Sequence, residues 1–164
     1  SVSINGFYSR VDIRREALSD TSEGSLTFAV PRLEPKNAGL VFSENDKNSF
    51  MAQFGDKVDF IDAKLIKLDD LLLSNVGIVK IDAEGAEYKI WTGMQATISS
   101  NPDICILMEF NSARDYDAIS FYDEMSERFE VRHVDFDGQI KILTKEMIET
   151  QRINQDWMLF LARN

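Results

Sequence analysis

The sequence has 164 residues, of which 44% are hydrophobic and 28% are charged, and its formal net charge is −10. This length allows one hydrophobic core, so we predict a single domain over residues 1–164. The acidic balance argues against a basic nucleic-acid groove, and the longest apolar runs are too short to cross a bilayer.

Cysteine content and the first residues indicate the cellular compartment. Cys105 is the only cysteine, so no disulfide can form within the chain. The residues after Ser1 include neither the basic segment nor the apolar segment of a secretory signal. We therefore expect a reducing cytoplasm as the compartment.

The first part of the chain predicts short strands, which we expect at 11–18, 25–30 and 58–65, followed by a short helix at 68–72. The first of these strands rests on Val11 and Ile13, which alternate with charged residues. Residues 31–56 contain several turn formers and show little hydrophobic period. We expect them to form an irregular surface excursion.

The second part of the chain alternates strands and helices. We expect strands at 76–81, 104–110, 129–134, 139–143 and 157–162, and helices at 87–99, after Ser112 and at 144–152. The strands at 76–81 and 104–110 should be parallel neighbours, joined by the helix at 87–99 through a right-handed crossover. Asp137-Gly138 predicts a hairpin turn. The fold class is therefore α/β, with a mostly parallel sheet and an antiparallel edge.

Carboxylates follow two of these strands, at the edge where open α/β sheets bind ligands. Asp82 ends one strand, with Glu84 and Glu87 close behind it, and Glu109 ends the next, with Asn111 nearby. A structural interpretation is also open, because a helix N-terminus stabilises negative charge. Hard cations usually take ligands from more than one segment, so we expect no metal site.

These residues resemble the motifs of FkbM-type methyltransferases in order and spacing. The matching segments are Leu68-Asp69-Asp70-Leu71-Leu72, Lys80-Ile81-Asp82-Ala83-Glu84-Gly85-Ala86-Glu87, Gly93 and Leu107-Met108-Glu109-Phe110. Weaker matches are Glu16-Ala17-Leu18-Ser19-Asp20 upstream and Asp156-Trp157-Met158-Leu159-Phe160-Leu161 downstream.

The resemblance implies methyl transfer from S-adenosylmethionine to a hydroxyl of a sugar, a polyketide or a similar small molecule. A carboxylate could act as general base for that hydroxyl. The roles implied for this chain are catalysis by Asp82 first and Glu109 second, substrate binding by Glu84, Glu87 and Asn111, and cofactor binding by Glu16, Ala17 and Asp82.

By the same resemblance, we expect two elements of that family's cofactor site to be missing from this sequence, a glycine-rich turn and an acid that holds the ribose. No two of the eight glycines are closer than eight residues, so there is no glycine-rich turn of the G-x-G type. We therefore expect an incomplete Rossmann-like methyltransferase sheet that is inactive without an N-terminal cofactor-binding part. The alternative is a non-catalytic domain of the same fold that associates with itself or with a partner. In either case we expect a second copy or an N-terminal segment to cover the open sheet edge.

Overall fold

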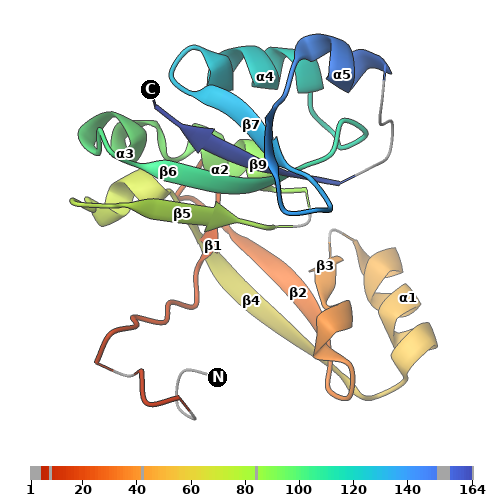
Figure 1. Cartoon of the computed structure of the whole chain (residues 1–164). Helices are drawn as coiled ribbons and strands as arrows, with labels where there is room; N and C mark the ends of the chain where they lie inside the picture. The colour runs from red at the N-terminus through yellow and green to blue at the C-terminus, as the bar shows by residue number, and fades with distance from the viewer. Residues whose placement is uncertain (1–4, 8, 42, 84, 151–155, 164) are drawn as a thin grey trace. The chain divides into compact units, whose positions relative to one another are not determined.

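The computed structural model describes residues 5–7, 9–41, 43–83, 85–150 and 156–163 (Figure 1). We predict one domain from the sequence, whereas the chain divides into two compact units. Unit 1 comprises residues 1–17 and 22–66, and unit 2 comprises residues 18–21 and 67–164.

Unit 1 is built on a small, mostly antiparallel sheet with the strand order β1-β4-β2-β3. Its strands are β1 (Ala17–Leu18), β2 (Ser25–Pro31), β3 (Gly39–Val41) and β4 (Val58–Ile66). β2 pairs along its whole length with β4, from Ser25 opposite Lys64 to Pro31 opposite Val58. The strands predicted at 25–30 and 58–65 are therefore confirmed.

Two predictions in unit 1 are wrong. Residues 31–56 are not irregular, because they contain η1 (Pro35–Asn37), β3 and α1 (Glu44–Phe54). α1 has no fully buried residue, and it contacts the core of unit 1 only through Phe50 and Phe54, one turn apart. Its start is marked by a capping box between Ser43 and Asp46. The strand predicted at 11–18 is reduced to β1, and Val11 and Ile13 are exposed outside it.

Unit 2 contains a five-stranded sheet with the order β5-β6-β9-β7-β8. Its strands are β5 (Ile78–Ile81), β6 (Cys105–Phe110), β7 (Glu130–Val134), β8 (Ile140–Ile142) and β9 (Trp157–Ala162). β5 and β6 are parallel, as predicted, while β9 is antiparallel to both β6 and β7. β7 and β8 form the predicted hairpin, in which Gly138 has a φ of 77°.

The α/β class is confirmed, but the prediction of a mostly parallel sheet with antiparallel pairing only at its edge is wrong. β9 is inserted between β6 and β7, so most hydrogen-bonded pairs in the sheet are antiparallel. Because β6 and β7 both oppose β9, β5, β6 and β7 all point the same way. β9 is apolar on both faces, which suits an interior strand.

The helices of unit 2 are η2 (Leu68–Leu71), α2 (Glu87–Thr92), α3 (Gln95–Ser100), α4 (Ala118–Ser126) and α5 (Lys145–Thr150). The single helix predicted at 87–99 is thus two helices. Asp69 causes the break: its carboxylate accepts the N–H groups of Ala96 and Thr97, at 3.0 and 2.7 Å. In the part of the chain that the structure describes, no helix has the length and apolarity to span a membrane.

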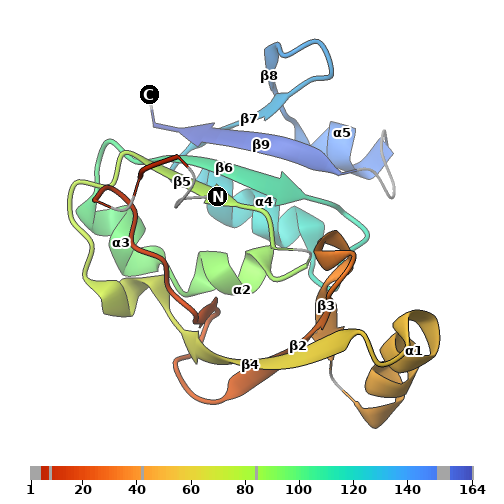
Figure 2. The ribbon, with the colours of Figure 1, turned by 90° about the horizontal axis from the view of Figure 1, so that it is seen from below.

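The core of unit 2 lies between the sheet and α2, α3 and α4, which lie on one side of it (Figure 2). Along β6, Ile106, Met108 and Phe110 are buried, while the alternate residues are only half-buried. On the opposite face Leu107 is paired with Phe160 of β9, and neither belongs to the core. This second face is therefore apolar in its centre and is not packed against the helices.

A glycine is required at position 93, just after α2, because the backbone of Ser19 lies very close to it. A Cβ atom at this position would lie 2.0 Å from the carbonyl oxygen of Ser19. The backbone carbonyl of Gly93 also accepts the N–H of Asp69, at 3.1 Å. Gly93 therefore connects two segments that are distant in sequence, Ser19-Asp20 and the η2 turn.

We predict that Gly93→Ala destabilises the chain by about 2 kcal/mol or more, because the backbone of Ser19 must move to admit the methyl group. The matched control is Gly77→Ala, since a Cβ atom on Gly77 would have no neighbour within 4 Å. Its effect should stay within about 0.5 kcal/mol. Urea unfolding of both variants measures the difference, and equal midpoints would contradict the close approach.

Candidate functional site

The candidate site lies at the carboxyl ends of β5 and β6. The last residues paired between these parallel strands are Ile81 and Met108. Asp82 and Glu109 come next in each strand, so the register brings the two carboxylates to neighbouring positions at the same sheet edge. The structure thus places side by side the two residues for which the family resemblance implies catalysis.

Asp82 is the more accessible of these two carboxylates. Its side chain is 44% exposed, and its Oδ2 accepts a hydrogen bond from Lys80 Nζ at 2.6 Å. Lys80 lies two residues earlier, on the same face of β5. Such an exposed ion pair contributes about 1 kcal/mol or less to stability, so a substrate hydroxyl can compete for Asp82 at little cost.

The loop between β5 and α2 is shaped by Glu87. This side chain is buried, and its carboxylate accepts the backbone N–H of Ala83 at 3.0 Å and that of Gly85 at 2.9 and 3.1 Å. Gly85 has a φ of 104°, a conformation that favours glycine. Glu84, for which we predict a role in substrate binding, lies outside the described residues.

Glu109 is the less accessible carboxylate, with a side chain that is 19% exposed. Its Oε2 lies 3.5 Å from the guanidinium of Arg114, and the same guanidinium lies 4.0 Å from the carboxylate of Asp156. Asn111 donates from Nδ2 to Asp156 at 2.8 Å. A Cβ atom on Gly85 would lie 3.8 Å from Arg114 Cδ, so Arg114 also borders the Glu87 loop.

Sequence reasoning missed Arg114 and Asp156 as site residues. Asp156 reaches the site only because β9 runs antiparallel beside β6, which places the start of β9 next to the end of β6. Arg114 follows β6 in an irregular loop. Arg114 belongs to no motif visible in the sequence, and Asp156 begins only the weak match to the family's last strand, which implies no site role for it. Only the three-dimensional arrangement brings both residues to the site.

Tyr116 stabilises the loop that follows β6. Its hydroxyl oxygen accepts the backbone N–H of Asn111 at 3.2 Å, and its ring lies 6.1 Å from that of Tyr88. Burial raises the pKa of Tyr116 to about 12. The hydroxyl is therefore protonated at neutral pH and holds the loop that carries Asn111 and Arg114.

Glu16 and Ala17, the residues implied for adenine contact, belong to unit 1 and are described with it. Glu16 accepts a hydrogen bond from Arg14 at 2.9 Å, and this bond lowers the pKa of the Glu16 carboxyl. Ala17 begins β1. Among the described residues of the chain, no three His, Cys, Asp or Glu side chains gather closely enough to hold a metal ion.

The family model of the FkbM methyltransferase domain matches residues 14–145. The chain belongs to the FkbM methyltransferase family. The match includes Asp82 and Glu109 and ends before β9. No curated protein and no solved structure matches this FkbM-family chain.

We predict that the stability of the chain falls as the pH rises from about 10 to about 12. The unfolded chain releases a tyrosine proton near pH 10, whereas burial keeps Tyr116 protonated up to about pH 12. The folded state binds more protons in this window, so deprotonation favours unfolding. Tyr116→Phe should show a smaller loss over the same window in urea unfolding, and an unchanged loss would contradict the assignment.

Proposed function

We propose that this chain carries the acceptor side of an S-adenosylmethionine-dependent O-methyltransferase site. The acceptor is a hydroxyl of a sugar, a polyketide or a similar small molecule. The observation that carries the proposal is the adjacent placement of Asp82 and Glu109 at the ends of two parallel strands, in a chain of the FkbM methyltransferase family. The lone cysteine is compatible with a reducing cytoplasm as the site of action.

Asp82 is the first choice for the general base, and Glu109 is the second. An alcohol that attacks a methyl group must lose its proton, and a carboxylate beside it can accept that proton. Asp82 is exposed and forms a surface ion pair with Lys80, whereas Glu109 is largely covered and lies beside Arg114. An acceptor hydroxyl can therefore reach Asp82 more easily.

The remaining residues of the site orient the acceptor in this proposal. Both carboxylate oxygens of Glu87 bind loop amides, so it acts by fixing the loop that precedes α2. Asn111 and Glu84 are kept as acceptor contacts. Asn111 is already positioned by its bond to Asp156.

S-adenosylmethionine, when bound, would supply the electrophilic methyl group. Asp82 would face that methyl group, and Glu16 and Ala17 would border the adenine. The sequence encodes no glycine-rich turn whose amides could hold the amino-acid end of the cofactor. The residues present thus fit only part of the cofactor, which supports a site completed by a further cofactor-binding part.

The direction of the strands supports a Rossmann-like origin of unit 2. β5, β6 and β7 point the same way, and only β9 and the short β8 run against them. We propose that this sheet is the C-terminal part of a methyltransferase sheet. β5 is its end strand, so an N-terminal segment or a second copy of the chain would cover that edge.

In any preparation of this chain that transfers methyl groups, Asp82→Asn should lower turnover by about 10²- to 10⁴-fold, the usual contribution of a general base. Cofactor affinity should change much less, and the unfolding midpoint should stay near that of the wild type. Glu109→Gln is the matched comparison and should have the smaller effect on turnover. Wild-type-like turnover of the Asp82 variant would remove this residue from catalysis.

The 164-residue chain alone should bind S-adenosylmethionine more weakly than micromolar. Each polar contact that remains adds about 0.5–1.5 kcal/mol, whereas micromolar affinity requires about 8 kcal/mol. Isothermal titration calorimetry of the purified chain gives the dissociation constant. A micromolar or tighter value would show that another segment rebuilds the cofactor site and would overturn the half-site proposal.

A further inference from the structure

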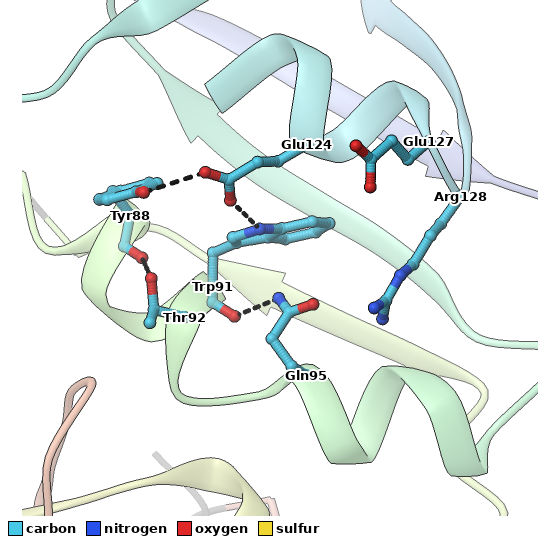
Figure 3. Close-up of a pocket in the computed structure, with 7 residues that line it drawn as sticks. All are labelled: Tyr88, Trp91, Thr92, Gln95, Glu124, Glu127 and Arg128. Carbon is cyan, nitrogen blue, oxygen red and sulfur yellow. Dashed lines mark hydrogen bonds between the residues drawn. The ribbon is translucent and has the colours of Figure 1, made fainter. Parts of the chain in front are cut away.

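A cavity lies on the helical side of unit 2, and its lining includes neither Asp82 nor Glu109. It has a volume of about 330 Å³ and opens between α2, α3 and the end of α4. Figure 3 shows the polar side chains that line it around the indole of Trp91, which are Tyr88, Gln95, Glu124, Glu127 and Arg128. Its volume is at the lower end of the range for small-molecule pockets, which suits a ligand with a single ring.

Glu124 is held in a fixed position at this cavity. One carboxylate oxygen accepts the hydroxyl of Tyr88 at 3.0 Å, and the other accepts the indole N–H of Trp91 at 3.2 Å. The bond to Glu124 also raises the pKa of Tyr88. Each carboxylate oxygen has two acceptor positions, so each can accept one further hydrogen bond from a ligand.

Hydrogen bonds also fix two other polar side chains of the cavity, Gln95 and Arg128. Gln95 donates its side-chain N–H to the backbone carbonyl of Trp91 at 2.6 Å, so its amide oxygen is available as an acceptor. Arg128 donates to the hydroxyl of Ser99 at 3.3 Å, which holds its guanidinium at the rim of the cavity. Acceptors on two walls and a cationic donor on a third therefore surround the same space (Figure 3).

We propose that this cavity binds a neutral polyhydroxylated ligand of monosaccharide size. A hydroxyl both donates and accepts, so adjacent hydroxyls can donate to Glu124 and Gln95 while another accepts from Arg128. A simple cation would match the carboxylates but would be repelled by Arg128, whose charge offsets that of the neighbouring Glu127. The proposal concerns binding alone and does not depend on methyl transfer.

The test uses the two tryptophans of the chain, whose indole N–H groups give separate NMR signals in the ¹⁵N-labelled protein. Glucose, galactose, mannose and N-acetylglucosamine are titrated one at a time. At least one sugar should shift the Trp91 indole signal saturably, because that N–H is bonded to Glu124. The Trp157 signal should stay in place, since Trp157 lies in β9, away from the cavity lining.

Variants of the cavity residues test whether the shift of the Trp91 signal reports binding in this cavity. Glu124→Gln should weaken binding at least tenfold. Glu127→Gln provides a second test, because it changes an exposed side chain and leaves the bonds of Glu124 to Tyr88 and Trp91 intact. Glu146→Gln on α5 is the matched control and should leave the affinity unchanged. The proposal is overturned if no sugar gives a saturable Trp91 shift, if only methylammonium or guanidinium does so, or if both cavity variants bind like the wild type.

Discussion

The candidate site depends on one buried carboxylate, that of Glu87. Loops seldom bury their polar groups, because backbone N–H groups need partners away from water. Here the two amides of the loop after β5 find their acceptor in the first residue of α2. The turn from strand to helix is thereby fixed from inside. Without this carboxylate, the backbone N–H groups of Ala83 and Gly85, which follow Asp82 in the loop, would lose their acceptor.

Several residues that mark the family have structural tasks that support this turn. Asp69 caps the N-terminus of α3, so that α2 and α3 are separate helices. Gly93 has no side chain and therefore allows the backbone of Ser19 to approach closely. α2 therefore remains a short helix held at both ends, at its start by Glu87 and at its end by the contacts of Gly93. Three residues of the family motif, Asp69, Glu87 and Gly93, thus make contacts with the backbone, whereas Asp82 of the same motif is exposed.

The sequence predicts those parts of the fold that are determined by local patterns. The apolar runs of β5 and β6 and the Asp-Gly turn between β7 and β8 are visible along the chain, and the structure confirms each of them. α1 is not predictable from hydrophobic period, because Phe50 and Phe54 are its only aromatic residues, they pack only partly buried on the core of unit 1, and the rest of the helix is mostly polar. The insertion of β9 was missed because strand order is decided by contacts over long sequence separations, which leave no periodic signal.

The same distinction applies to the site. The placement of Asp82 and Glu109 at one sheet edge could be predicted, since strand ends can be read from the sequence and neighbouring parallel strands end at one edge. Arg114 and Asp156 could not, because they arrive from an irregular loop and from the start of β9. Their presence changes the chemistry of the edge: Arg114 places a cation beside Glu109 and also lies near the Asp156 carboxylate, whereas Asp82 forms an exposed ion pair with Lys80. Two carboxylates that look equivalent in sequence therefore differ in accessibility and charge environment, and that difference is what assigns proton transfer to Asp82 in the proposed reaction.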